Sequence, residues 1–110
     1  MISPLRLSLA ALLATSALAA PATAMAEPVF RRIASFPVAA NLPAEMPAET
    51  ETSSEIITAS ADGNTLIYSD SPAGGIGLID ITDPKAPKAG GFLAMDGEPT
   101  SVAVAGGNVL

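Results

Sequence analysis

The alternation of apolar and turn-forming residues in the central part of the chain predicts four consecutive β-strands. Each apolar run is short and rich in β-branched or aromatic side chains, which suit a pleated, partly buried surface. Residues 62–64, 71–75 and 82–84 separate these runs with Gly, Pro, Asp and Asn, which form tight turns or interrupt a ladder. The predicted strands, which in series form a β-meander, cover residues 56–59, 65–68, 76–81 and 91–95.

The same pattern restarts after the fourth strand, which indicates a repeated unit. A strand-like run at residues 101–105 is followed by a Gly-Gly turn and a second apolar run. Residues 107–110, GNVL, resemble residues 63–66, GNTL, 44 positions earlier. A four-stranded unit that recurs every ~40–45 residues is typical of a β-propeller blade. An unrelated meander is the alternative.

Two stretches resemble repeats of known β-propeller families. The stretch ITASADGNTLIYSD is similar to the first half of the YVTN repeat, with an apolar strand, an S-x-D-G turn and a strand carrying leucine and tyrosine. The stretch GIGLIDITDPKAPKAGGF and the following GEPTSVAVAGGNVL resemble the LVIVD repeat. The resemblance covers about half of the chain and implies an all-β fold, in which residues 55–110 form about one blade and the start of the next. It is greatest to exported bacterial propellers described as esterase-like, phytase-like or alkaline-phosphatase-like.

A propeller of this kind predicts more chain than the sequence contains. Each blade has two apolar faces that neighbouring blades must cover, so a closed ring takes ~4–8 blades, or roughly 200–350 residues at the usual repeat length. The chain has 110 residues, with three phenylalanines, one tyrosine and no tryptophan. We therefore expect an N-terminal fragment whose partners are the remaining blades. Alone, such a fragment is expected to be unfolded or to aggregate through free strand edges.

Residues 1–26 have the pattern of a secretory signal peptide. Arg6 precedes an apolar, helix-favouring run at residues 7–20, and residues 24–26, Ala-Met-Ala, place small side chains before the expected cleavage after Ala26. Residues 17–19, Ala-Leu-Ala, are a weaker alternative site. The apolar run is shorter than the ~20 residues that span a bilayer, and no cysteine is present to carry a lipid. We expect a secreted or periplasmic protein without a stable membrane anchor after cleavage.

Residues 27–54 lead from the signal peptide to the predicted blade. Residues 29–38 have the composition of one strand, which either completes the last blade of a closed propeller or is an ordinary lead-in strand. Residues 41–54 are rich in Pro, Ala, Glu and Thr, so they are expected to form an extended linker or a long surface loop. Their glutamates are expected to be solvated, because a flexible tract does not hold metal ligands in a rigid frame.

Charge and residue counts exclude several functions. The chain carries eleven acidic and five basic side chains, and one of the basic ones lies in the predicted signal peptide. Such a negative protein is repelled by the phosphates of nucleic acids and anionic membranes. The absence of cysteine excludes disulfides, and the absence of histidine excludes a Ser-His-Asp triad and histidine metal ligands within this chain.

The remaining candidates for chemistry are carboxylates at predicted strand ends, namely Asp70, Asp80, Asp83 and Asp96. Several blades together could supply such carboxylates to a calcium ion or a phosphoester, although each one alone is typical of a turn. Asp70 is the strongest candidate because it precedes a glycine-rich loop. That loop, residues 74–77, leads into a strand, so it is predicted to be a hairpin turn and not a phosphate-binding loop. The sequence assigns no catalytic, cofactor-binding or metal-binding residue, and calcium stays a candidate cofactor of the intact protein only.

Two functions fit these observations, and whether the protein is an enzyme stays open. The resemblance and the export signal favour a hydrolase of phosphoesters or similar esters. The lack of a nucleophile–base pair favours a non-catalytic propeller that binds or scaffolds a small-molecule or protein ligand of unknown identity. The residues alone slightly favour the binding role. When the resemblance is included, the two functions are supported about equally.

Overall fold

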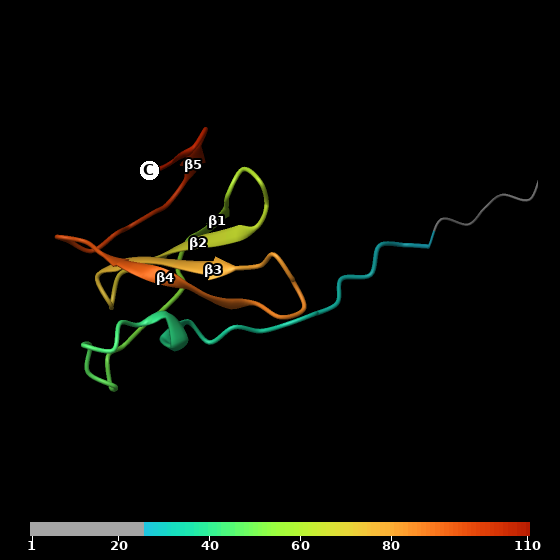
Figure 1. Ribbon diagram of the computed structural model, residues 1–110. Helices are drawn as coiled ribbons and strands as arrows, with labels where there is room; N and C mark the ends of the chain where they lie inside the picture. Colours follow the sequence, from blue (N-terminus) through green and yellow to red (C-terminus); the bar gives the residue numbers. More distant parts are fainter. Residues whose placement is uncertain (1–25) are drawn as a thin grey trace, which may run out of the picture.

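The computed structural model describes residues 26–110, which form an all-β arrangement around one four-stranded antiparallel sheet (Figure 1). The predicted signal peptide, apart from Ala26, lies outside the described residues. From residue 26 onward, no helix has the length and apolar character needed to cross a membrane.

The sheet is a meander, as the sequence predicted. Its strands lie side by side in chain order, and each is antiparallel to the next. The β2–β3 pair has an unbroken register from Thr65↔Asp80 to Asp70↔Gly75, which makes it the centre of the sheet. Strand β2 is longer than predicted, and β4 begins earlier. The strands are β1 (Ile57–Ala59), β2 (Thr65–Asp70), β3 (Gly75–Asp80) and β4 (Lys88–Ala94).

Local chemistry explains the first turn. Between β1 and β2, the Asp62 carboxylate accepts hydrogen bonds from the Ser60 hydroxyl, 2.6 Å, and the Asn64 amide, 3.0 Å, while Gly63 adopts a φ of 73°. These hydrogen bonds hold the pKa of Asp62 below its usual value. The carboxylate and the glycine therefore build the hairpin expected from the Asp-Gly pair.

A bulge interrupts the pairing of β3 with β4. The register shifts between Leu78 and Ile79, because Gly90 is an extra residue between the two β4 residues that pair with them. A Cβ atom on Gly90 would lie 2.9 Å from the Leu78 backbone, and Gly91 has a φ of 125°. Both positions therefore require glycine, and the bulge bends the edge of the sheet.

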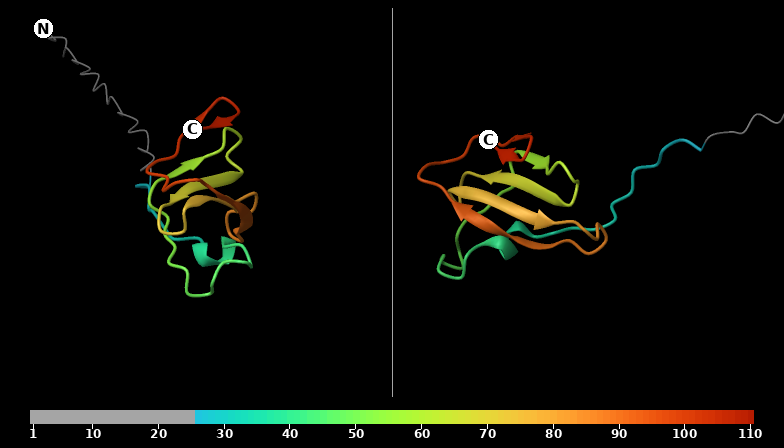
Figure 2. Two further views of the ribbon diagram at one scale, coloured as in Figure 1. Left: turned by 90° about the vertical axis from the view of Figure 1, so that its left-hand side faces the viewer. Right: turned by 45° about the horizontal axis from the view of Figure 1, so that its top comes forward.

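After β4 the chain turns back over the sheet and forms a small hairpin of β5 (Val104–Ala105) and β6 (Asn108–Val109). The strand predicted over residues 101–105 is thus limited to its last two residues. The β5–β6 turn is also tighter than the β1–β2 turn. Both turns contain a glycine with positive φ, Gly106 in the former and Gly63 in the latter. The last pairs of the two hairpins are Ala59↔Leu66 and Ala105↔Asn108, so the β5–β6 turn is the shorter one. Figure 2 shows the β5–β6 hairpin in red near the C-terminus.

Residues 29–38 form no strand within the described chain, so the prediction of an ordinary lead-in strand is wrong; a strand that completes the last blade of a closed propeller stays a prediction. Residues 26–37 have no regular structure, and a short 3-10 helix, η1 (Val38–Asn41), follows them. The Phe30 side chain is 98% exposed, although it lies in the most strand-like part of the segment. The chain runs beneath the sheet towards η1, and none of its backbone groups is hydrogen-bonded to a strand edge, so no ladder can form (Figure 1).

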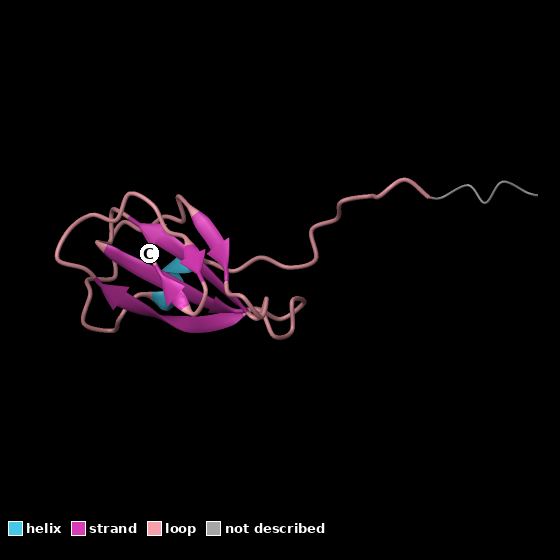
Figure 3. Ribbon diagram, turned by 90° about the horizontal axis from the view of Figure 1, so that it is seen from above, coloured by secondary structure: helices cyan, strands magenta, loops and turns pink. Residues whose placement is uncertain are grey.

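The sheet therefore lies between two coverings of different kinds. One face, here called the strap face, carries Tyr68 and Asp70 and is covered by η1 and the segment that follows it. The opposite face, here called the hairpin face, carries Ile67 and Ile76, which pack with Val102 beneath the β5–β6 hairpin. Figure 3 looks down on the sheet from the hairpin side, with η1 on the far side.

Candidate functional site

Asp70, the strongest sequence candidate, is fully buried on the strap face. Its carboxylate accepts hydrogen bonds from the Ser53 amide at 3.0 Å, from the Ala73 amide at 3.1 Å and from the Thr52 hydroxyl. The bond from Ala73 is the turn-forming contact expected of a strand-end aspartate. The other two attach the preceding segment to the sheet, so the described residues satisfy this carboxylate internally and leave none of it facing solvent.

Asp80 and Asp83 lie at the opposite end of the sheet and also form turns. The Asp80 carboxylate accepts a hydrogen bond from the Thr82 amide at 2.9 Å, and Asp83 accepts one from the Lys85 amide at 3.0 Å. Hydrogen bonds from Thr82, together with the positive charge of Lys88, hold the pKa of Asp80 below its usual value. Asp80 is partly exposed and Asp83 is exposed, which distinguishes both carboxylates from the fully buried Asp70.

The four candidate carboxylates do not converge. Asp96 is exposed in the turn after β4, at the end of the sheet where Asp70 is buried, whereas the other two lie at the far end. Among residues 26–110, no three acidic side chains are placed to hold a metal ion. Within the described chain, the four predicted site residues therefore do not form a common site.

A second buried polar group on the strap face was not anticipated from the sequence. Asn41, at the end of η1, is 6% exposed, and its side-chain amide donates to the Tyr68 hydroxyl at 3.0 Å and to the Leu78 carbonyl at 2.7 Å. Burial raises the pKa of Tyr68 above its usual value. The Leu78 carbonyl lies where the bulge interrupts the β3–β4 register. The asparagine therefore donates a hydrogen bond to a backbone carbonyl at the irregular part of the sheet.

Two glycines of β3 make room for aromatic rings on the strap face. Gly77 lies opposite Tyr68, and a Cβ atom on Gly77 would overlap the Tyr68 ring. A Cβ atom on Gly75 would likewise overlap the Phe92 ring. The sequence signal for this arrangement was present as glycines at alternate positions of a strand, a pattern that indicates close approach of another group.

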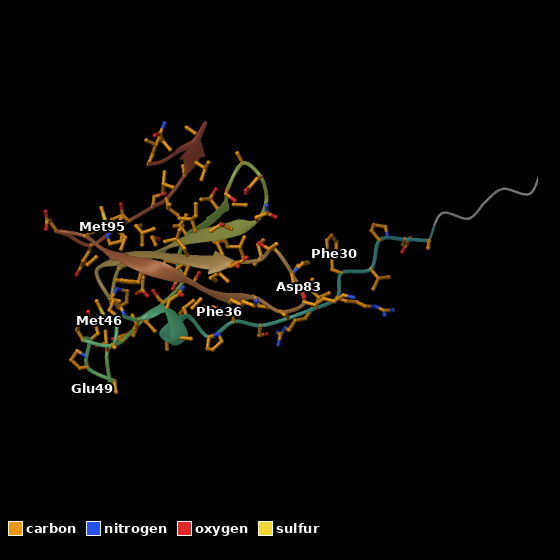
Figure 4. The ribbon with its side chains drawn as sticks, viewed as in Figure 1. Phe30, Phe36, Met46, Glu49, Asp83 and Met95 are labelled. Atoms are coloured by element: carbon orange, nitrogen blue, oxygen red, sulfur yellow. The ribbon has the colours of Figure 1, made fainter. Side chains whose placement is uncertain are left out.

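The hairpin face presents an open apolar groove of about 390 Å³. Leu93 is 60% exposed, Met95 49% and Leu110 75%, so the hairpin covers this face only in part. Met95 projects at the end of β4 in Figure 4. Large apolar side chains gathered on one side of a sheet mark a surface that a partner covers. The groove is lined by Ile67, Ile76, Leu78, Leu93, Met95, Pro99, Ser101, Val109 and Leu110.

A smaller hollow of about 290 Å³ lies on the strap face, beside η1. The N-terminal segment contributes Ile33 and Phe36 to its wall, and the sheet contributes Ile57, Leu66 and Ile79. The irregular N-terminal segment therefore covers apolar sheet surface even though it forms no strand.

These surfaces define an all-β protein with a four-stranded antiparallel sheet, one strapped face and one apolar face that is partly open. None of the family models, curated proteins and solved structures compared with the chain matches it.

Proposed function

We propose that residues 55–110 form one blade and the start of the next in an exported β-propeller that acts as a binding or scaffolding module. The observation that carries this proposal is the apolar groove on the hairpin face. A neighbouring sheet packed on Leu93 and Met95 would bury side chains that are now 60% and 49% exposed, at a gain of about 25 cal/mol for each Å² of apolar surface. The remaining blades are the partners of this surface.

The order of elements supports the same proposal. A four-stranded meander is followed by a hairpin that lies over one of its faces and resembles the first hairpin of the meander in sequence. Consecutive blades of a propeller are stacked in this manner around a central channel. The hydrogen bonding of Asp70 supports a binding role over a catalytic one, because this carboxylate already accepts three hydrogen bonds from its own chain.

Thiol labelling of the intact protein tests the proposed packing. Residues 1–110 contain no cysteine, so labelling is read by mass spectrometry of the peptide that carries Leu93→Cys on the hairpin face. The peptide that carries Lys85→Cys in the exposed β3–β4 loop is the control. If a neighbouring blade covers the groove, maleimide should react with the Leu93→Cys variant about 100-fold more slowly than with the control, since labelling then requires local opening. Equal rates would show that the face is open and would contradict the blade proposal.

Export is the second part of the proposal, and the mature N-terminus tests it. The protein recovered from the periplasm or medium should begin at Glu27, as read by mass spectrometry of its N-terminal peptide. A bulky residue at the predicted cleavage position, Ala26→Phe, should block processing, whereas Ala19→Phe at the alternative position should not. A mature chain that begins at residue 20, or an unprocessed chain that stays in the membrane, would refute cleavage after Ala26.

Hydrolysis of phosphoesters or similar esters, with calcium as a cofactor of the intact protein, is the second candidate function. The resemblance to hydrolase-like propellers motivates it, and one structural observation favours it. The charged residues Asp80, Asp83 and Lys88 line a pocket of about 230 Å³ where β3 leads into β4. Asp80 is ionised at neutral pH like any ordinary aspartate, which suits an interaction with a cation held jointly with other blades.

A further inference from the structure

Residues 41–53, here called the strap, cover Tyr68 and Asp70. Side chains hold the strap to the sheet at both of its ends. At the first end, Asn41 donates to Tyr68 and to the Leu78 carbonyl. At the second end, the Thr52 hydroxyl and the Ser53 amide donate to the Asp70 carboxylate. Between these ends the chain projects from the sheet, as Met46 and Glu49 show in Figure 4.

The strap has no backbone ladder with the sheet. Within the described part of the chain, the hydrogen bonds between backbone groups made by the strap stay inside it or reach η1, as in the two successive turns closed by Met46 and Thr50. Its larger apolar residues, Leu42 and Met46, are only partly buried. Regular backbone bonding starts only beyond the strap, where the Glu55 amide donates to the Ser69 carbonyl at 3.1 Å. The layer that covers Tyr68 therefore depends on four hydrogen bonds, each of which uses a side chain.

Closure of the strap also leaves polar atoms unsatisfied. The Asn41 Oδ1 and Ser53 Oγ atoms are buried without a hydrogen-bond partner, one at each end of the strap. A buried polar atom that lacks a partner loses its hydration without compensation. When the strap leaves the sheet, both atoms regain water, so relief of this burial cost favours opening.

From these contacts we propose that the strap is a cover that opens while the sheet stays folded, and that its opening controls access to Tyr68 and Asp70. The two ends differ in what they expose. Release of Asn41 uncovers the Tyr68 hydroxyl, and release of Thr52 and Ser53 uncovers a carboxylate that keeps only its bond from Ala73. The open state thus presents an aromatic ring and a carboxylate on one face, two positions apart on β2.

Hydrogen exchange on the intact protein, read by mass spectrometry of peptides, tests the opening. Peptides that cover residues 41–54 should exchange faster than peptides from β2 and β3, because regions held by few buried contacts open at lower free energy than the whole domain. A Thr52→Val variant keeps the side-chain shape but removes one hydrogen bond to a buried carboxylate. It should increase exchange at the second end of the strap about tenfold to a hundredfold and leave β2 and β3 unchanged.

Thr50→Val is the matched control, since Thr50 lies in the same strap and its hydroxyl makes no hydrogen bond to another described residue. It should leave exchange of the strap unchanged. Three results would overturn the proposal: strap and sheet peptides that exchange together, a Thr52→Val effect that includes β2 and β3, or a Thr50→Val effect as large as that of Thr52→Val. Unprotected β2 and β3 peptides in the parent protein would also overturn it, because the strap would then have no folded sheet to leave. This test is separate from the thiol labelling of the hairpin face, which reports on the opposite side of the sheet.

Discussion

A single methyl group at Gly77 is expected to destabilise the protein by about 3 kcal/mol or more, at the upper end of the cost of overpacking. A Cβ atom at this position would overlap the Tyr68 ring. The ring cannot move away easily, because its hydroxyl is held by Asn41 and its side chain is fully buried. Urea unfolding of the Gly77→Ala variant, followed by circular dichroism, measures the loss as a lower midpoint.

The control for this prediction is Gly97→Ala. Gly97 lies in the exposed turn after β4, where a Cβ atom would meet nothing within 4 Å, so this variant should differ from the parent by less than about 1 kcal/mol. A double variant, Gly77→Ala with Tyr68→Ala, removes the ring that causes the overlap. Its destabilisation should be clearly smaller than the sum of the two single changes. Additive losses would show that the overlap with Tyr68 is not the cause.

The meander was predictable from the sequence because each strand is defined locally. Its boundaries follow from residues that act on their own backbone, such as Asp62 with Gly63 in the first turn and Asp83 before Pro84 in the third. The apolar, β-branched and aromatic residues of β2 and β3 favour strands without information from distant parts of the chain. The propeller itself stays a proposal, since no closed ring of blades lies among the described residues.

The strap could not be predicted in the same way, because its contacts join residues that are far apart in the chain. Asn41 belongs to a polar, proline-rich tract whose composition indicates solvent exposure, yet it is buried. Its side-chain amide donates a hydrogen bond to the Leu78 carbonyl, which lies at the β3–β4 bulge. The segment at residues 29–38 shows the opposite case. Its composition suits a strand, but strand formation also requires an edge that offers it hydrogen bonds, and the chain passes beneath the sheet instead.

Asp70→Ala is expected to cost about 3 kcal/mol or more, because Thr52, Ser53 and Ala73 would each lose the acceptor of a partly buried hydrogen bond. Asp70→Asn keeps one acceptor oxygen and should lose less. Asp83→Ala is the matched control, since this carboxylate bonds a backbone amide in an exposed turn, and its removal should cost less than about 1 kcal/mol. Urea unfolding of the intact protein ranks the three variants.

The same variants separate a structural Asp70 from a catalytic one. If Asp70 only holds the strap and the turn, any hydrolysis of p-nitrophenyl phosphate or p-nitrophenyl acetate by the intact protein should continue at the parent rate per folded molecule in Asp70→Asn. A catalytic carboxylate behaves differently, since replacement by the neutral amide removes the charge that the reaction uses while most of the packing remains. Parent-like stability combined with a hundredfold or greater loss of kcat in Asp70→Asn would therefore contradict the structural role. Such a result would also require the strap to open before substrate binds, because Asp70 has no exposed surface when the strap is closed.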